Sequence, residues 1–209
     1  MKINNIDLRS DTITIPSKRM LEYMFDAKVG DDVWEEDETV KALEKELAFM
    51  FSKETALFCP SGTMTNQIAI RVHTKMGDEV ICDQSSHIYN YEGGGIAANA
   101  GASVKVIHSH RGKMTPLDVL DCINPDDYHC PVSRLVSIEN TSNKGGGSCY
   151  TVNEMVEIGD YITQGTASMA ERDRAIHAPG ALLPRGSFRP ALVEFRVVAH
   201  SLGHWAPIG

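Results

Sequence analysis

Cys59-Pro60-Ser61-Gly62-Thr63-Met64-Thr65-Asn66 is the stretch of this sequence that decides the fold. The apolar run 56–58 before it predicts the end of a buried strand, and Met64, Ile68 and Val72 recur at helical spacing after it. A strand that passes into a helix through Ser-Gly-Thr suits a phosphate group, because the first N–H groups of a helix lack intrahelical partners and carry the positive end of its dipole. An ordinary helix cap uses the same residue types, so this stretch alone favours a cap.

The composition is that of an ordinary globular protein. The 209 residues are 42% hydrophobic and 23% charged, which suffices for one sizeable core. The net charge of −8 argues against a nucleic-acid partner, and no apolar run approaches the length that spans a membrane. The five widely spread cysteines contain no C-x-x-C pair, which argues against a disulfide framework and a metal site. With no signal peptide at the N-terminus, we expect a cytoplasmic protein.

Strands and helices alternate along the chain. We expect strands over residues 55–58, 79–83, 103–107 and 134–139, and helices over 17–27, 38–51, 62–75, 96–100, 114–123 and 151–162. Ser17 is expected to cap the first of these helices, and Thr151 with Glu154 to form a capping box at the last. The alternation predicts an α/β fold with three layers, in which helices flank a largely parallel sheet.

Two polar loops follow the expected strands 79–83 and 134–139. The first loop contains His87 and Glu92 before a glycine triplet, and the second is the glycine-rich run 140–147. In open α/β sheets, ligands bind beyond the carboxyl ends of the strands. These two loops are therefore candidates for a binding site.

The composition changes near Gln164. Ten lysines precede this residue, whereas residues 165–209 contain none and carry arginine instead. We expect residues 1–164 to form an incomplete domain and residues 165–209 an atypical tail that is non-native or disordered. A stretch of about 45 residues is small for an independent core, and a truncated or frame-shifted reading of a gene would produce such a tail.

Six motifs in one order give the chain a family resemblance. They are Asp7-Leu8-Arg9-Ser10-Asp11-Thr12, Val29-Gly30-Asp31-Asp32-Val33, Pro60-Ser61-Gly62-Thr63-Met64-Thr65-Asn66, Gly77-Asp78-Glu79-Val80, His87 with Tyr91-Glu92-Gly93-Gly94, and Glu139-Asn140-Thr141. Over about residues 6–164 the chain resembles the L-threonine aldolases, in the β-eliminating lyase group of fold-type-I pyridoxal-phosphate enzymes. The C-terminal part departs from this family.

The resemblance implies a cofactor site for pyridoxal 5'-phosphate. Ser61, Gly62 and Thr63 match the family loop that holds the cofactor phosphate, in agreement with the phosphate hypothesis above. His87 matches the histidine that stacks on the pyridine ring, where a flat π-system suits the aromatic cofactor. The alternative for His87 is a structural histidine whose hydrogen bonds are satisfied.

The resemblance also implies candidate substrate-binding and catalytic residues. Ser10 matches a serine near the substrate carboxylate, and Arg9 beside it has a supporting or a structural role. Glu92 matches an acidic residue close to the cofactor. Some relatives have a histidine where this chain has Ser142, so the base that takes the β-hydroxyl proton is Glu92, His87 or a water molecule.

Family members use the cofactor as an electron sink and cleave threonine or allo-threonine to glycine and acetaldehyde. They need a lysine for the Schiff base, but no matching segment follows Gln164, and the last lysine, Lys144, does not match in position. We therefore expect an enzyme by family whose activity is impaired in this chain. The alternatives are a related lyase acting on another amino acid and a non-catalytic cofactor-binding remnant. The family also implies a homodimer or homotetramer.

Overall fold

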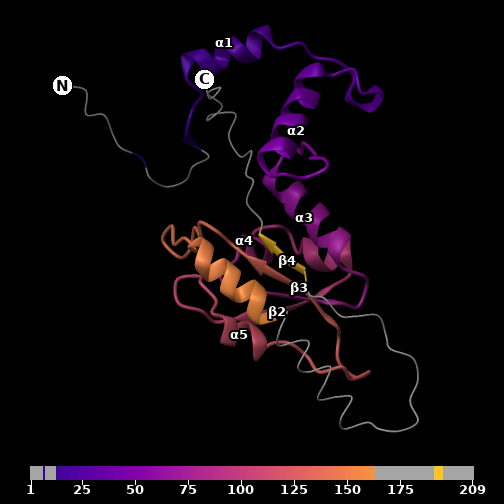
Figure 1. Ribbon diagram of the computed structural model, residues 1–209, viewed down its shortest axis with the longest axis vertical. Helices are drawn as coiled ribbons and strands as arrows, with labels where there is room; N and C mark the ends of the chain where they lie inside the picture. Colours follow the sequence, from indigo (N-terminus) through magenta and orange to yellow (C-terminus); the bar gives the residue numbers. More distant parts are fainter. Residues whose placement is uncertain (1–6, 8–12, 163–190, 195–209) are drawn as a thin grey trace, which may run out of the picture. The chain divides into compact units, whose positions relative to one another are not determined.

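The computed structural model describes residues 7, 13–162 and 191–194 (Figure 1). The chain divides into two compact units, of which one contains the residues up to Met64 and the other begins at Thr65. The boundary falls inside helix α3 (Gly62–His73), which begins in the first unit and ends in the second. None of the described helices is long and apolar enough to cross a membrane.

The first unit is helical. Helix α1 (Lys18–Asp26) begins after Ser17, whose Oγ accepts a hydrogen bond from the N–H of Met20 at 3.3 Å, so the predicted cap is confirmed. A short 3-10 helix, η2 (Asp32–Trp34), precedes α2 (Glu38–Met50). The carboxylate of Asp37 caps α2, and hydrogen bonds from the N–H groups of Val40 and Gly30 lower the pKa of this carboxyl group.

The strand predicted over residues 55–58 is wrong. These residues form no strand, and the side chain of Leu57 is 67% exposed. The N–H of Phe58 donates to Oε1 of Glu44 on α2 at 2.7 Å. A strand forms when a neighbouring backbone satisfies its N–H and C=O groups, and here a side chain takes that role for Phe58.

The second unit is built on a parallel sheet of four strands in the order β2-β1-β3-β4. The strands are β1 (Glu79–Asp83), β2 (Ser103–Ile107), β3 (Ser133–Ile138) and β4 (Ala191–Glu194). The predicted bounds of the first two strands are confirmed, and the third begins and ends one residue earlier than predicted. Strand β4 belongs to the expected tail 165–209, the rest of which lies outside the described residues, as does the predicted boundary at Gln164.

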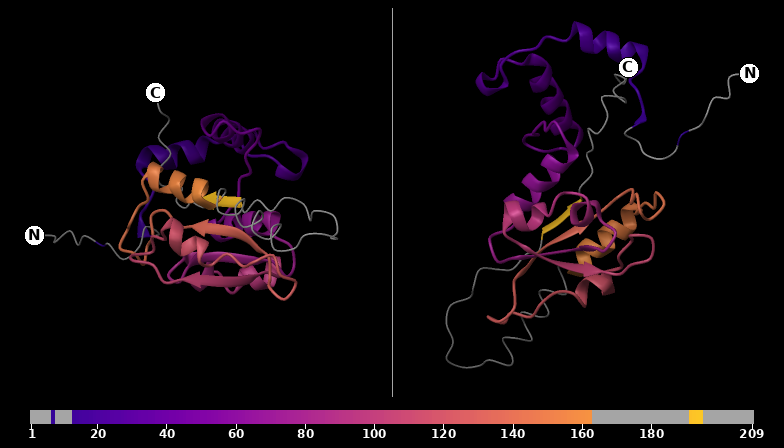
Figure 2. Two further views of the ribbon diagram at one scale, coloured as in Figure 1. Left: turned by 60° about the horizontal axis from the view of Figure 1, so that its bottom comes forward. Right: turned by 180° about the vertical axis from the view of Figure 1, so that it is seen from behind.

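Two hydrophobic clusters lie on opposite faces of this sheet, because successive side chains of a strand point to opposite sides. One cluster packs α3, α4 (His87–Asn90) and η3 (Ile96–Ala100) on the sheet, with Ile70, Val80, Cys82 and Leu135 at its centre. The other packs α5 (Pro116–Leu120) and the helical residues 152–162 on the opposite face, with Ile81, Val119, Val136 and Ile158 at its centre. The predicted three-layer α/β fold is confirmed, and Figure 2 shows the helices packed along the strands.

Two of the predicted helices differ in detail. Residues 96–100 form a π-helix, and α5 covers only the middle of the expected range 114–123. Thr115 caps α5 through a capping box with Asp118. The predicted box of Thr151 and Glu154 is confirmed: Oε2 of Glu154 accepts from the N–H of Thr151 at 2.7 Å, and the N–H of Glu154 donates back to Oγ1 of Thr151 at 3.2 Å.

The order of the strands reverses at β1. From β1 the chain passes to β2 on one side and then returns to β3 on the other side of β1. In open parallel sheets, ligands bind beyond the carboxyl ends of the strands at such a reversal, because the loops there diverge and leave a crevice. The residues that follow Asp83 and Ile138 therefore stand at the expected position for a site.

Candidate functional site

His87 and Glu92 lie together beyond the end of β1. His87 begins α4, and its Nδ1 lies 2.9 Å from Oε1 of Glu92. The side chain of Glu92 is fully buried, whereas 47% of the His87 side chain is exposed. A carboxylate oxygen accepts hydrogen bonds, so Nδ1 is the nitrogen that donates in this contact. The structure thus brings together the two residues that the sequence named as catalytic candidates.

Two amide side chains of α3 hold the Glu92 carboxylate. Nδ2 of Asn66 donates to Oε1 and Nε2 of Gln67 donates to Oε2, each at 2.6 Å. Gly95 leaves the space for this arrangement, because a Cβ atom there would lie 2.4 Å from the Gln67 side-chain amide. With the His87 contact, the carboxylate has three partners, as a buried charge requires.

Sequence reasoning assigned no role to Asn66 or Gln67. The helical spacing drew attention to Met64 and Val72, but these side chains are 45% and 69% exposed. The buried face of α3 instead carries Gln67 and Ile70, which are 8% and 0% exposed. The sequence does contain a signal for Gln67. It precedes Ile70 by three residues, and residues with this spacing lie on the same face of a helix.

Glu139 connects the two loops at the carboxyl ends of β1 and β3. It follows β3 directly, and its Oε2 accepts a hydrogen bond from the N–H of His87 at 2.5 Å. Its Oε1 accepts from the N–H of Asn143 at 3.3 Å. One half-buried carboxylate therefore fixes the start of α4 against the loop that follows β3.

The carboxylate of Asp83 likewise connects the segments that follow β1 and β2. This residue is 2% exposed, and its carboxylate accepts hydrogen bonds from the N–H and Oγ–H groups of both Ser85 and Ser109 at 2.5 to 3.1 Å. Burial alone would raise the pKa of Asp83, but the four hydrogen bonds outweigh it and the pKa is lowered. The site is thus supported by a carboxylate that is ionised when the protein is folded.

The predicted phosphate-binding residues form the start of α3. Oγ of Ser61 accepts a hydrogen bond from the N–H of Met64 at 3.1 Å, which is the geometry of a helix cap. Gly62 and Thr63 follow as the first helical residues, and within the described part of the chain no hydrogen bond engages their N–H groups. A cap and a phosphate site are compatible here, because the cap takes up only one of the free N–H groups of this 12-residue helix.

The predicted substrate-binding residues lie in a part of the chain that the structure does not describe. Arg9 and Ser10, the candidate substrate-binding residues, lie outside the described residues. Among the residues that are described, no group of three His, Cys, Asp or Glu side chains is arranged to hold a metal ion.

Comparison with known proteins shows which family shares this arrangement. The family model of the beta-eliminating lyases matches residues 7–175. The low specificity L-threonine aldolase of Escherichia coli K12 is 40% identical over 177 residues, which are 84% of this chain and 50% of that protein. Low-specificity L-threonine aldolase 1 of Arabidopsis thaliana is 39% identical over 164 residues, 77% of this chain and 46% of that protein. The chain spans about half the length of the curated relatives it matches.

Solved structures show the same fold. A Listeria monocytogenes protein with the provisional name L-allo-threonine aldolase superposes with a TM-score of 0.56 at 23% identity, over 69% of this chain and 40% of that one. The complex of SepCysS with the N-terminal domain of SepCysE gives a TM-score of 0.55 at 16% identity, over 72% and 40%. These likenesses show the fold of the fold-type-I pyridoxal-phosphate enzymes. Because the family model covers most of its length, this chain belongs to the beta-eliminating lyases, a family of pyridoxal-phosphate-dependent enzymes.

Proposed function

We propose that this chain carries the cofactor-binding part of a pyridoxal-phosphate-dependent aldolase that cleaves L-threonine or L-allo-threonine to glycine and acetaldehyde. The observation that carries the proposal is the His87–Glu92 pair at the reversal between β1 and β3. It occurs in a chain that is 40% identical to the E. coli low specificity L-threonine aldolase over 177 residues. When bound, the cofactor would accept the electron pair of the Cα–Cβ bond that breaks.

In this proposal the start of α3 holds the cofactor phosphate. The N–H groups of Gly62 and Thr63 have no partner within the described residues, and they stand at the positive end of the helix dipole. The hydroxyl oxygen of Ser61 accepts from the N–H of Met64 at the same helix start, where serine side chains are common. The residues present therefore fit a phosphate group.

His87 would lie against the pyridine ring of the cofactor, with Glu92 as its positioning residue. The His87 ring is half exposed, so an aromatic ligand can reach its face, and the buried carboxylate fixes its orientation and its tautomer. All three donors on Glu92 belong to the protein, which favours positioning over proton abstraction. The base for the β-hydroxyl proton is then Nε2 of His87 or a water molecule. Arg9 and Ser10 are retained as substrate contacts on the family resemblance.

The chain alone is expected to be impaired as an enzyme. Residues 165–209 contain no lysine, and no segment there matches the family position for the Schiff-base lysine. A non-catalytic cofactor-binding protein is therefore the second candidate function. A third is a related lyase that acts on another amino acid.

We also propose that the complete protein is a cytoplasmic homodimer or homotetramer. Within the first unit, Phe25, Trp34 and Phe49 are 91%, 76% and 82% exposed. Exposed aromatic side chains of this size are residues that a partner subunit can cover. Analytical ultracentrifugation of the chain and of its Phe49→Ser variant tests this: a dimer that the variant weakens is expected. A monomer at all concentrations contradicts a self-association surface on this unit.

The function is tested by titrating pyridoxal phosphate into the chain in a calorimeter and then adding amino acids. We expect saturable cofactor binding, together with little or no acetaldehyde from L-threonine or L-allo-threonine in an assay coupled to alcohol dehydrogenase. Pyruvate and ammonia from serine or cysteine would favour the related lyase. Absence of cofactor binding by a chain that circular dichroism shows to be folded would overturn the proposal.

A further inference from the structure

Arg111 has a backbone conformation that is unusual for its residue type. It lies with Gly112 at the centre of a turn after β2, in which the N–H of Lys113 donates to the carbonyl oxygen of His110 at 3.2 Å. The φ angles of Arg111 and Gly112 are 56° and 74°. Two positive φ angles are the pattern of a type I′ turn, whose first central position favours Asn, Asp or Gly. An arginine in this conformation is strained and requires support from its surroundings.

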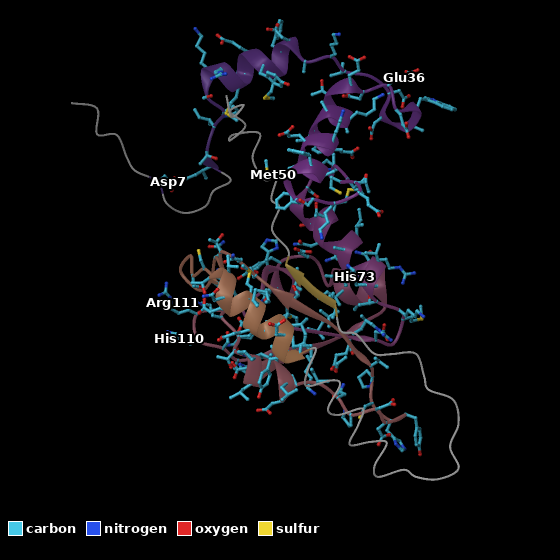
Figure 3. The ribbon with its side chains drawn as sticks, in the orientation of Figure 1. Asp7, Glu36, Met50, His73, His110 and Arg111 are labelled. Carbon is cyan, nitrogen blue, oxygen red and sulfur yellow. The ribbon has the colours of Figure 1, made fainter. Side chains whose placement is uncertain are left out.

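The side chain of Arg111 contacts the glycine-rich loop that follows β3, residues 140–147. Its Nε donates to the carbonyl oxygen of Gly145 at 2.9 Å, and its Nη2 donates to that of Gly146 at 3.4 Å. In the opposite direction, Oγ of Ser148 donates to the carbonyl oxygen of Arg111 at 2.5 Å. Figure 3 labels Arg111 and its neighbour His110 in the turn after β2. Hydrogen bonds from both segments therefore join the arginine turn to the loop.

The turn and the loop approach each other so closely that glycine is needed on both sides. A Cβ atom on Gly145 would lie 2.0 Å from the carbonyl oxygen of Arg111, and one on Gly112 would lie 2.4 Å from Oγ of Ser142. Ser142 is 1% exposed, and its Oγ accepts from the N–H of Gly145 at 3.2 Å. The position of the loop is therefore defined by its packing against the turn as well as by hydrogen bonds.

The glycine-rich loop reaches the candidate site at two points. The N–H of Asn143 donates to Glu139, whose other carboxylate oxygen accepts from the N–H of His87. Nζ of Lys144 lies 5.2 Å from the centroid of the Tyr91 ring, which is 5.6 Å from the His87 ring. Both series of contacts end at His87. A displacement of the loop would therefore change the surroundings of this histidine.

We propose that Arg111 is a positioning residue of the candidate site, which acts on His87 through the glycine-rich loop. Strained residues persist where the surrounding structure holds them, and they are frequent at functional sites. A guanidinium group suits this role because its donors are fixed in one planar fork and reach two neighbouring carbonyl groups together. The inference rests on the proposed function for the identity of the ligand at His87, pyridoxal phosphate.

The Arg111→Asn variant distinguishes this role from a role in the turn alone. Asparagine is favoured at the first central position of a type I′ turn, so the turn should form at least as well as in the parent. The shorter side chain cannot reach both carbonyl groups of the loop. We expect amide hydrogen exchange of residues 142–147 to become about tenfold faster or more, while exchange in β1 stays unchanged. The NMR signal of the His87 N–H should shift, because its hydrogen bond to Glu139 is disturbed.

Two further variants control for the charge and for the turn. Arg111→Lys keeps the positive charge but lacks the planar fork, so it should restore only part of the protection of the loop. The same measurements on Arg111→Lys serve as the test if Arg111→Asn does not fold. His110→Ala changes the exposed neighbour in the same turn, and we expect it to leave both the loop exchange and the His87 signal unchanged.

Calorimetry with pyridoxal phosphate relates the loop to the proposed function. Arg111→Asn should lower the affinity by about threefold or more, whereas His110→Ala should not. The inference is overturned if a folded Arg111→Asn keeps the loop exchange or the His87 signal of the parent, or binds the cofactor as tightly as a parent that binds it. In those cases cofactor binding by the parent leaves the proposed function standing. If the loop exchange and the His87 signal change but the parent binds no cofactor, the proposed function fails and the positioning of His87 by Arg111 stands.

Discussion

Oε1 of Glu92 lies 2.9 Å from Nδ1 of His87, and this contact joins a fully buried carboxylate to a half-exposed ring. The carboxylate is fixed from behind by Asn66 and Gln67 on α3. Burying a charge without partners costs several kcal/mol, so the two amides make the burial possible. The ring in turn takes its orientation from α3 as well as from the short helix α4 that it begins.

Replacing Glu92 by Gln should loosen His87 and destabilise the fold. The amide offers an NH₂ group where the carboxylate offers a second acceptor, so one of the donors on Asn66, Gln67 and His87 loses its partner. We expect a loss of about 1–3 kcal/mol in the free energy of unfolding. Nitrogen NMR of the His87 ring should show both tautomers in place of one. An unchanged spectrum would mean that Glu92 does not position the ring.

Gly95→Ala tests the packing behind the same carboxylate. The added methyl group would lie 2.4 Å from the Gln67 amide and must displace it from Glu92, at a cost of about 1–3 kcal/mol in the free energy of unfolding. The control is a double-mutant cycle with Gln67→Ala, measured by urea unfolding. If the clash with Gln67 is the cause, Gly95→Ala should cost much less in the Gln67→Ala background. Equal costs in both backgrounds would assign the effect to the backbone at Gly95.

Three of the four strands of the second unit could be predicted from sequence, because β1, β2 and β3 are short runs with β-branched residues between turn signals. The segment 55–58 has the same local character but forms no strand. The local sequence pattern reflects the conformational preference of the side chains. It does not show whether another strand is close enough to form backbone hydrogen bonds. At Phe58 the carboxylate of Glu44 is the partner instead.

The contacts of the candidate site could be predicted only in part. The order of the motifs was enough to name His87 and Glu92, but it gave no indication that Asn66 and Gln67 hold the Glu92 carboxylate. Counting apolar residues on α3 places the core at Met64 and Val72, and a buried amide such as Gln67 lowers the apparent hydrophobicity of the true core face. Hydrogen bonds between segments more than twenty residues apart leave no periodic signal in the sequence.

Ser61→Ala should weaken both α3 and the binding of pyridoxal phosphate. Loss of the cap to Met64 is expected to cost about 1 kcal/mol in the free energy of unfolding. Loss of a hydroxyl donor to a charged phosphate should lower the affinity by about tenfold or more. Ser17→Ala is the matched control, because Ser17 caps α1 with the same geometry and has no proposed ligand. Calorimetry should give a lower cofactor affinity for Ser61→Ala only; equal affinities in both variants would remove Ser61 from the site.

Asp83 should make the stability of the fold depend on acid pH. Its carboxylate is buried and accepts four hydrogen bonds from Ser85 and Ser109, and these lower its pKa in the folded protein against the raising effect of burial. A carboxyl group with a lowered folded pKa contributes stability that is present above its unfolded pKa, about 3.9, and is lost as the pH falls through the folded pKa. The protein should therefore lose stability below about pH 4.

The Asp83→Asn variant isolates this contribution, because an amide does not ionise but keeps the size of the side chain. At neutral pH the variant should be less stable than the parent by about 1–3 kcal/mol, since the charged acceptor of four hydrogen bonds is replaced by a neutral group. As the pH falls below about 4, the parent becomes protonated and the difference between the two proteins should shrink. Urea unfolding of both proteins between about pH 7 and pH 3 measures this difference. A gap that stays constant over the whole range would show that the carboxyl of Asp83 has no lowered pKa in the folded protein.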